Sequence, residues 1–445
     1  MINNDNIRKS SVITVYEPGM FGSCAFRIPS LLTTVKGTLI AGIDVRYNDI
    51  QDNPNQIAIG LRRSTDRGDS WGDLQVPVRY PGEGLDGAAS LDSALLEDRV
   101  TGTIWMIFSH TPGGVGLRSS RQGKGFDPHG FRLLYDAEGR ECTLREGIVF
   151  DSEGKETHYA VAENGDVLSS GRYAGNIYLK EGVAPQSFLE ARTSFLQAIK
   201  SDDDGLTWSS PIELNLDVKQ PWMRFIGAGP GRGIQLQVGA NQGRLLFPVY
   251  FSNASGILSC AVIYSDDHGK SWAMGRSPND GRQWQGETVS AESLTAPEAQ
   301  LTESQAVELD NGELLLYMRN HAGCGRTAVS SSQNGGETWG EVRFEDALPN
   351  PTCQATVIRY PDREHGRTLL LWANPAHVEH RRTGKLRLSE DGGKCWGYSR
   401  TVHPGEYGYS CLSELPDGEA ALLYEADGGT IRFTTFTLAW VRQKK

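Results

Sequence analysis

The sequence predicts an all-β protein, and three observations lead to that fold class. An eight-residue pattern with a fixed glycine and a closing tryptophan recurs five times along the chain. Apolar runs of strand length, such as those at 244–251, 314–320 and 368–374, separate the copies. Glycine contributes 52 of the 445 residues, well above the usual ~7%, which favours many tight turns over long helices.

The repeated pattern is Ser-x-Asp-x-Gly-x-Ser/Thr-Trp, and we call each copy a box. Three copies match it fully, a fourth has Asn334 in the acidic slot, and a fifth has Cys395 in the hydroxyl slot; the copies lie at 64–71, 201–208, 265–272, 332–339 and 389–396. The acidic side chain can cap backbone N–H groups, glycine supplies positive φ, and tryptophan can pack the turn onto its own sheet. We therefore expect the boxes on an outer rim and interpret Asp66, Asp203 and Asp267 as structural rather than catalytic.

The spacing of the boxes predicts a β-propeller. Their acidic slots, at 66, 203, 267, 334 and 391, lie 137, 64, 67 and 57 residues apart. About 60 residues with strand-like runs between boxes fit one four-stranded blade per copy. The interval of 137 residues is too long for one blade, so it holds an unmarked blade, an insertion or both. We interpret 118–190, which has its own short strands and glycine turns, as a β-rich insertion within a propeller spanning 10–442.

Charge and cysteine usage limit the partners and the compartment. The net charge of −11 excludes a broadly basic nucleic-acid surface, so an anionic ligand would need a local arginine cluster. No apolar run approaches the ~20 residues of a membrane helix, and we expect no membrane partner. The N-terminus lacks the apolar segment of a signal peptide, which predicts a cytoplasmic protein, or a secreted one if the N-terminus was trimmed. Seven scattered cysteines without a C-x-x-C pair favour reduced thiols over disulfides or a zinc site.

The sequence carries no cofactor signature. The glycine-rich run at 227–233 does not have the GxGxxG spacing and lies in no βαβ unit, and there is no Walker loop or HExxH motif. The nine histidines show no ligand spacing. We therefore expect no cofactor and no catalytic metal, and we expect the protein to act as a monomer.

The motif Phe26-Arg27-Ile28-Pro29, followed by the boxes, resembles the bacterial exo-α-sialidases (neuraminidases). That family is marked by F/Y-R-I-P followed by such boxes on a six-bladed propeller. Further similar segments follow in the family's order, at 222–236, 243–250, 264–272 and 301–309. The likeness spans nearly the whole chain, and it is closer to a branch with a small β-rich insertion that includes hydrolases and intramolecular trans-sialidases. It implies six blades and sialylated glycans as partners.

The resemblance assigns three arginines to the substrate. Sialic acid carries a carboxylate on its anomeric carbon, and a planar, permanently charged guanidinium suits it. The matching positions are Arg27 in the FRIP motif, Arg319 in LLLYMRN and Arg381 in HRRTGKLRLS. Arg382 is an adjacent rival, but counting back from the run at 387–389 selects Arg381.

The resemblance also implies a tyrosine nucleophile, as in other sialidases. A carboxylate attacking beside the substrate's own carboxylate would be repelled, whereas a neutral phenol is not. A phenol with an ordinary pKa of about 10 needs a neighbouring base. The family's Y-S-x-L pattern selects Tyr409 over the nearby Tyr407, with Glu303 in LTESQ as its base.

Three further positions complete the expected site. Asp52, 25 residues after Arg27 on an Asn/Asp/Pro loop, matches the acid/base residue, with Asp49 as a decoy. Arg46 ends the preceding strand and should line the same pocket. Asp92 matches an aspartate that contacts the ring or acylamino group of the substrate, although Asp86 is close by.

These residues predict an exo-α-sialidase that retains configuration through a covalent sialyl–tyrosine intermediate. One alternative shares the machinery: if bulky aromatic side chains exclude water from the leaving-group side, the substrate's own O7 can attack, which makes the enzyme an intramolecular trans-sialidase releasing 2,7-anhydro-sialic acid. The other alternative is a non-catalytic propeller that binds sialoglycans. The full set of arginines together with the Tyr, Glu and Asp candidates favours an enzyme. The sequence does not predict the preferred linkage.

Overall fold

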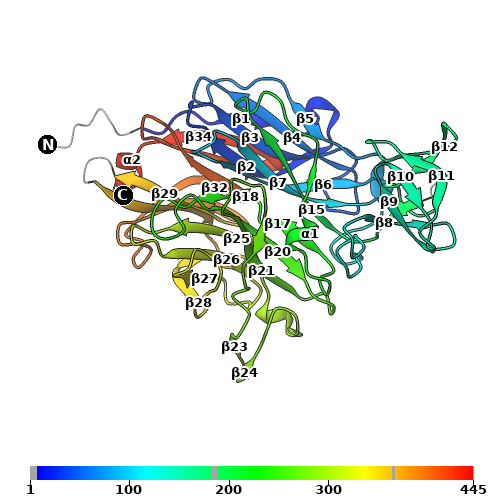
Figure 1. The fold of residues 1–445 in the computed structure, drawn as a ribbon. Helices are drawn as coiled ribbons and strands as arrows, with labels where there is room; N and C mark the ends of the chain where they lie inside the picture. The colour runs from blue at the N-terminus through cyan, green and yellow to red at the C-terminus, as the bar shows by residue number, and fades with distance from the viewer. Residues whose placement is uncertain (1–7, 183–187, 363–365, 444–445) are drawn as a thin grey trace.

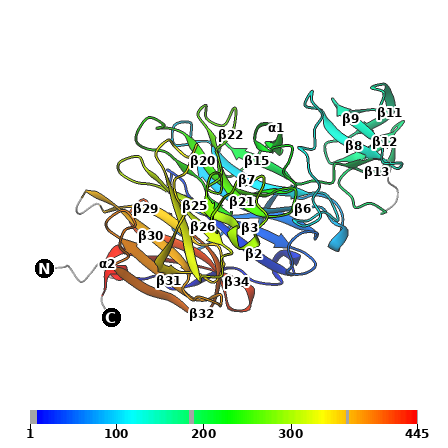
Figure 2. The same ribbon diagram turned by 90° about the horizontal axis from the view of Figure 1, so that it is seen from below.

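The computed structural model describes residues 8–182, 188–362 and 366–443, and it shows a ring of antiparallel sheets with one further sheet at its side (Figure 1). The ring contains six blades, so the prediction of an all-β, six-bladed propeller with a small β-rich insertion is confirmed. The same projecting sheet is visible from below (Figure 2).

Each blade is read from its innermost strand to its outermost strand. The strands of blades 1 to 3 are β2 (Ala25–Thr33), β3 (Leu39–Arg46), β4 (Ile57–Ser64) and β5 (Gln75–Val78); β6 (Ala89–Glu97), β7 (Ile104–Thr111), β15 (Phe195–Ser201) and β16 (Ile212–Glu213); and β17 (Ile226–Ala228), β20 (Leu245–Ser252), β21 (Leu258–Ser265) and β22 (Ala273–Met274). The strands of blades 4 and 5 are β25 (Leu301–Glu308), β26 (Leu314–Asn320), β27 (Arg326–Ser332) and β28 (Arg343–Pro349), then β29 (Thr356–Asp362), β30 (Arg367–Pro375), β31 (Arg382–Ser389) and the first part of β32 (Tyr398–Glu414).

Blade 6 explains why there are five boxes for six blades. Its strands are the second part of β32, then β33 (Ala420–Ala426), β34 (Thr430–Phe436) and β1 (Ile13–Tyr16). In blades 1 to 5 the box forms the turn between the third and the fourth strand. In blade 6 these two strands come from opposite ends of the chain, so no turn joins them and no box is needed.

The boxes connect neighbouring blades. Asp66 accepts hydrogen bonds from the backbone N–H of Ser70 (2.9 Å) and from the Ser64 hydroxyl (2.7 Å), as expected for a cap. The prediction that tryptophan packs onto its own sheet was incomplete, because the Trp71 ring also meets Phe433 of blade 6 edge-on, 5.3 Å between centroids. The closing tryptophans therefore help to fill the space between adjacent blades.

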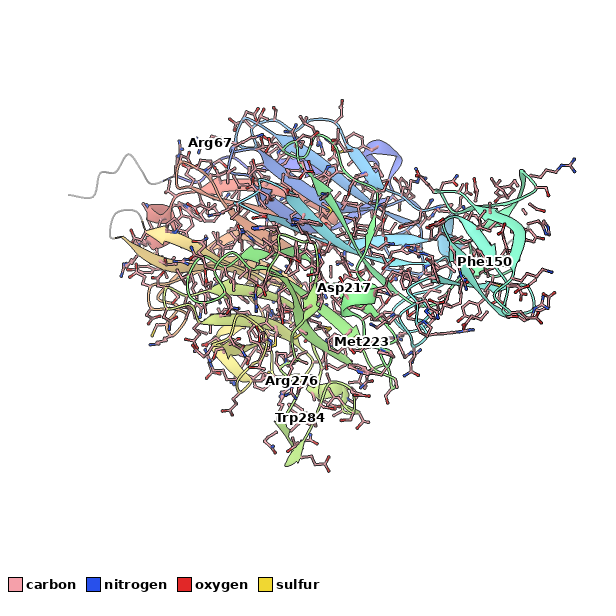
Figure 3. All side chains as sticks on the ribbon, viewed as in Figure 1. Arg67, Phe150, Asp217, Met223, Arg276 and Trp284 are labelled. Atoms are coloured by element: carbon pink, nitrogen blue, oxygen red, sulfur yellow. The ribbon has the colours of Figure 1, made fainter. Side chains whose placement is uncertain are left out.

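The long interval between the first two boxes contains a separate sheet within blade 2, between β7 and β15. Its seven strands follow the order β13-β12-β11-β10-β9-β8-β14. Their bounds are β8 (Arg132–Asp136), β9 (Glu141–Arg145), β10 (Ile148–Phe150), β11 (Glu156–Val161), β12 (Asp166–Ser169), β13 (Arg172–Asn176) and β14 (Phe188–Glu190). It has its own core around Leu134, Val149 and Val167. Figure 3 labels Phe150 in this sheet and Trp284 in the small projecting hairpin of β23 (Gln283–Trp284) and β24 (Glu287–Thr288).

Both faces of a blade are covered by neighbouring blades, which is why several strands are apolar without alternation. Every residue of β7, β20 and β25 is buried. Two short strands, β18 (Gly231–Arg232) and β19 (Ile234–Gln235), pair with β6 and β20 respectively. The innermost strands surround the centre of the ring, which we call the central channel. The described residues include two short α-helices, α1 (Asn215–Val218) and α2 (Leu438–Arg442). Among the described residues, no helix is long and apolar enough to cross a membrane.

Candidate active site

A bulge near the beginning of four innermost strands presents the functional side chains. Strand pairing shifts register between Arg27 and Ser30 in β2, between Leu91 and Ala94 in β6, between Leu301 and Ser304 in β25, and between Tyr407 and Ser410 in β32. A bulge adds a residue to one strand and re-aims its side chains, and such irregularities recur next to active sites. The residues in or at these bulges include Arg27, Asp92, Glu303 and Tyr409.

Tyr409, Glu303 and Arg319 form one hydrogen-bonded group. The Tyr409 hydroxyl donates to Glu303 Oε1 at 2.5 Å, and one Arg319 nitrogen donates to Glu303 Oε2 at 2.7 Å and to the Tyr409 oxygen at 3.0 Å. Burial and the charge of Glu303 raise the pKa of Tyr409 well above its ordinary value, although Arg319 opposes this. The phenol is therefore neutral at rest, and Glu303 is placed to take its proton during attack.

The other two predicted arginines lie over the Tyr409 ring. The guanidinium carbon of Arg27 is 5.4 Å from the ring centroid and that of Arg381 is 5.5 Å away. Arg382 instead lies 3.2 Å from the Nε2 atom of His377. The structure thus brings Arg27, Arg319 and Arg381 together around one phenol, where three guanidinium groups can hold a carboxylate.

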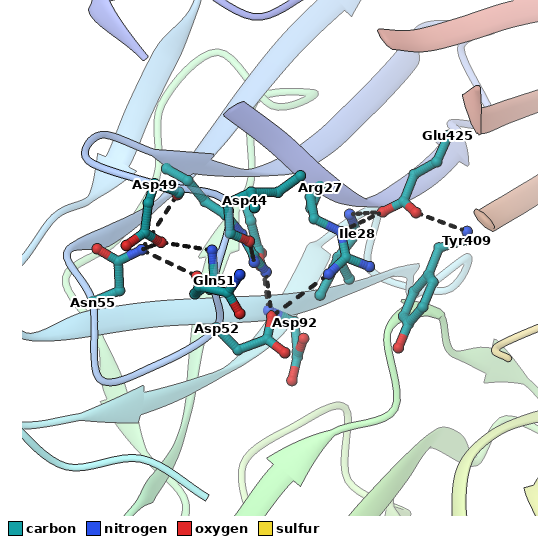
Figure 4. Close-up of polar contacts among 12 residues, drawn as sticks. Arg27, Ile28, Asp44, Asp49, Gln51, Asp52, Asn55, Asp92, Tyr409 and Glu425 are labelled. Carbon is teal, nitrogen blue, oxygen red and sulfur yellow. Dashed lines mark hydrogen bonds and ion pairs between the residues drawn. The ribbon is translucent and has the colours of Figure 1, made fainter. Parts of the chain in front are cut away.

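Asp52 faces this group from the loop after β3 (Figure 4). Its carboxylate lies 2.7 Å from Arg46 and 3.8 Å from Arg27, and its side chain is 61% exposed, so a substrate can reach it. Burial opposes its ionisation, but the charges of Arg46 and Arg27 outweigh it and hold the pKa of Asp52 below its ordinary value. A bound anion would offset those charges and raise this pKa, which a proton donor requires.

The rival aspartates have other roles in the structure. Asp49 accepts hydrogen bonds from the backbone N–H of Gln51 (2.6 Å) and from the Asn55 side chain (3.1 Å), so it shapes the loop that carries Asp52 (Figure 4). Asp86 pairs with Lys180 at 2.5 Å. Neither contact involves the arginines around Tyr409.

Asp92 lies in a buried acidic cluster. Its backbone N–H donates to Asp44 at 3.0 Å, and its carboxyl accepts the Tyr250 hydroxyl at 2.8 Å. Asp44 in turn pairs with the fully buried Arg46 at 3.1 Å. Burial and the charge of Asp44 raise the pKa of Asp92 well above its ordinary value, which favours the protonated form of this carboxyl.

Sequence reasoning missed Glu425, which connects two parts of the site. Its carboxylate accepts hydrogen bonds from Arg27 Nε (3.3 Å) and from the backbone N–H groups of Ile28 (2.9 Å) and Tyr409 (3.1 Å). A side chain at Gly408 would lie 2.1 Å from Glu425 Oε2, so glycine is needed for this approach. One signal was available: Glu425 is the acidic residue near the end of an otherwise apolar strand, AALLYEA.

A cavity lies elsewhere, at the C-terminal ends of the same inner strands. It has a volume of about 620 Å³, and its lining includes 32–35, 96–99, 306–308 and 413–416. Gln305 and Gln354, on two of these inner strands or beside them, both donate to the carbonyl of Pro230, at 3.1 and 3.3 Å. Its acidic groups are tied to the fold; Glu308, for example, accepts the backbone N–H groups of Gln237 and Val238.

Comparison with known proteins identifies the family of the chain. The pattern of the BNR repeat-like domain matches residues 148–422, more than half of the chain. The chain is 29% identical to an anhydrosialidase of Macrobdella decora over 95% of this chain and 61% of that protein. It is 31% identical to a sialidase of Micromonospora viridifaciens over 95% of this chain and 53% of that protein. The chain belongs to the BNR repeat-like domain family, and it spans between half and two thirds of the length of these two relatives.

Two solved structures resemble the whole fold. One is the intramolecular trans-sialidase from Ruminococcus gnavus in complex with oseltamivir carboxylate, with a TM-score of 0.81, 27% identity and coverage of 98% of this chain and 99% of that chain. The other is a leech intramolecular trans-sialidase complexed with 2,7-anhydro-Neu5Ac, also with a TM-score of 0.81 and 27% identity, covering 98% of this chain and 71% of that one.

Proposed function

We propose that the chain is an exo-α-sialidase that removes terminal sialic acid from sialylated glycans with retention of configuration. The observation that carries the proposal is the contact of the Tyr409 hydroxyl with both Glu303 and Arg319, beneath two further guanidinium groups. A neutral nucleophile paired with a base and surrounded by cations suits an anomeric carbon that bears a carboxylate. The sialidases among the relatives support the same reaction.

In the first step, the three arginines bind the substrate carboxylate and place the anomeric carbon beside the phenol. The Tyr409 oxygen forms a bond to that carbon while its proton passes to Glu303. The glycosidic bond breaks, and Asp52 gives its proton to the leaving oxygen. In the second step, Asp52 takes a proton from water, the water oxygen bonds to the anomeric carbon, and Tyr409 leaves and regains a proton from Glu303. Two displacements retain the configuration.

The covalent intermediate provides the direct test. A 3-fluorosialyl fluoride should react with Tyr409, because the ring fluorine slows both steps while the fluoride leaving group speeds the first. Mass spectrometry of the digested protein should show one added fluorosialyl group on the peptide that contains Tyr409. Labelling of another residue, or turnover of an aryl sialoside without any label, would contradict the proposed nucleophile.

A second candidate keeps the first step and changes the second. The similarity to two intramolecular trans-sialidases over 98% of this chain favours attack by O7 of the bound sialyl group, which would release 2,7-anhydro-sialic acid. The two products differ in mass by one water. Mass analysis of a 3′-sialyllactose digest therefore distinguishes the two reactions, and free sialic acid as the first product would reject this candidate.

A further inference from the structure

Two segments, 112–131 and 191–194, join the inserted sheet to blade 2, and we call them the stem. The stem lies against the loop of the proposed acid. The Asn53 side chain, next to Asp52, donates to the Thr111 hydroxyl at 2.9 Å. A side chain at Gly116 would lie 2.4 Å from the carbonyl oxygen of Asn53, so the two backbones are in close contact. Because Asp52 protonates the leaving oxygen, the remainder of the glycan must depart on the side of Asp52, which is also the side of this stem.

Four arginines lie on the stem or in contact with it, and we call them the stem arginines: Arg118, Arg121, Arg192 and Arg224. Arg224 donates to the carbonyls of Ser120 (2.8 Å) and Arg118 (2.7 Å). The backbone N–H of Arg121 donates to the carbonyl of Arg192 at 2.8 Å, and the guanidinium of Arg192 donates to the carbonyl of Gly113. These bonds join Arg224 to Arg118 and Arg121 to Arg192, and Arg118 and Arg121 lie three residues apart in the same segment.

The stem arginines are a local excess of positive charge, and Glu181 is an acidic residue that acts on one of them, Arg192. Among the described residues, no carboxylate lies within 4.0 Å of any of the four guanidinium groups in an ion pair. Arg244, by contrast, pairs with Asp266 at 2.8 Å. The protein as a whole carries −11, so this local excess runs against its overall field. Burial and the neighbouring charge of Arg121 lower the pKa of Arg192 to about 10, although Glu181 opposes them.

We propose that the stem arginines bind the carboxylate of a second sialyl residue, next to the one that is cleaved, so that disialyl glycans are the preferred substrate class. This inference rests on the proposed function, since it extends the leaving-group side of that site. Arg118 and Arg121 are exposed, so an incoming glycan can reach them. Arg192 and Arg224 are held by carbonyls, so little side-chain freedom is lost when an anion binds.

The test compares two substrates in two variants. An α2,8-linked disialyl glycan supplies the second carboxylate, and 3′-sialyllactose has a neutral leaving group. Arg118→Ala/Arg121→Ala should lower kcat/KM for the disialyl glycan by about three- to tenfold, with less than a twofold change for 3′-sialyllactose. The difference should shrink in 1 M salt, where exposed charges are screened. The control Arg99→Ala/Arg343→Ala removes two exposed arginines from other surfaces and should leave both substrates unchanged.

Each outcome decides one of the two proposals. If neither glycan is cleaved by the unmodified protein, the proposed function fails. If 3′-sialyllactose is cleaved but the stem variant affects both glycans equally, or neither, the stem arginines are not a carboxylate site. A 6-sulfated sialyllactose supplies a sulfate instead of a carboxylate. If its cleavage, and not that of the disialyl glycan, depends on the stem arginines, the assignment to a second sialyl residue is wrong.

Discussion

The same inner strands form both ends of the central channel, yet the charged side chains at the two ends have different partners. At the N-terminal ends of these strands, bulges in β2, β6, β25 and β32 interrupt the strand pairing. The guanidinium groups around Tyr409 can bind an anion there. At the C-terminal ends, glutamates accept hydrogen bonds from backbone N–H groups, as Glu97 does from Val35 at 2.8 Å. The cavity of about 620 Å³ lies at the C-terminal ends. The difference teaches that the proposed chemistry lies where strand pairing is broken and guanidinium groups are available.

The largest difference between the two ends is expected when the Tyr409 hydroxyl oxygen, at the N-terminal ends of the inner strands, is removed. Tyr409→Phe should lower kcat on an aryl sialoside by about a thousandfold or more, because the nucleophile is lost. Tyr407→Phe is the matched control. Tyr407 lies on the same strand as Tyr409, two residues before it, and is buried against Tyr424. Equal losses in both variants would show that the effect comes from packing and not from chemistry.

Asp52→Asn should lower kcat/KM for 3′-sialyllactose by about 10²- to 10³-fold, because no proton reaches the leaving oxygen. The loss should be smaller for an aryl sialoside, whose leaving group needs less protonation. Asp49→Asn on the same loop serves as the control and should cost far less. If the loss in Asp52→Asn does not depend on the leaving group, Asp52 is not the acid.

Glu425→Gln should lower kcat/KM by about ten- to a hundredfold, mainly through KM. The substitution removes the negative charge that holds Arg27. It also replaces one of the two carboxylate oxygens that accept backbone N–H groups. Steady-state kinetics with an aryl sialoside separate the two constants. A loss confined to kcat would contradict a role in orienting Arg27.

The pH dependence should reveal the proton on Asp52. In the free protein, Arg46 and Arg27 hold the pKa of Asp52 below its ordinary value, so kcat/KM should fall as pH rises through that lowered pKa. The bound carboxylate offsets these cations, so the corresponding decline in kcat should occur at a higher pH, by about one unit or more. Profiles of both constants between pH 3 and pH 8 provide the measurement, and coincident declines would contradict this electrostatic account.

The smallest effect on activity is expected at the other end of the channel. Glu308→Ala removes the acceptor of two backbone N–H groups and a partner of Arg359 at 3.4 Å. It should lower the free energy of unfolding by about 1–3 kcal/mol while kcat changes less than twofold. Urea denaturation and turnover of the same preparation measure both quantities. A large loss of kcat without loss of stability would show that the two ends are coupled.

The sequence was sufficient for the blades because each box is a local turn with its own chemistry. Counting boxes alone gives five blades, and the sixth has no box because β1 and β34 meet only in the folded chain. The site residues that belong to motifs, such as Arg27, Glu303 and Tyr409, are brought together by the structure as expected. Glu425 was missed because its role depends on the backbone of Tyr409 and on the close approach at Gly408, neither of which is visible in a motif.

The acidic cluster could not be predicted for a similar reason. Asp44 lies in the apolar run LIAGIDVR, which signals a buried charge but not its partner. Its contacts with Arg46 and with the backbone of Asp92 depend on the arrangement of blades 1 and 2 around the channel. The same holds for the stem arginines, which are spread over 118–224 and become neighbours only when the inserted sheet is in place.

Closure of blade 6 by β1 and β34 also determines when the molecule can begin to work. Arg27 lies in blade 1 and Tyr409 in blade 6, and the two are held together by Glu425, also in blade 6. A nascent chain that has completed four blades therefore contains the proposed acid, the proposed base and two of the arginines but not the proposed nucleophile. The proposed catalytic centre is complete only when the last blade of the ring is made.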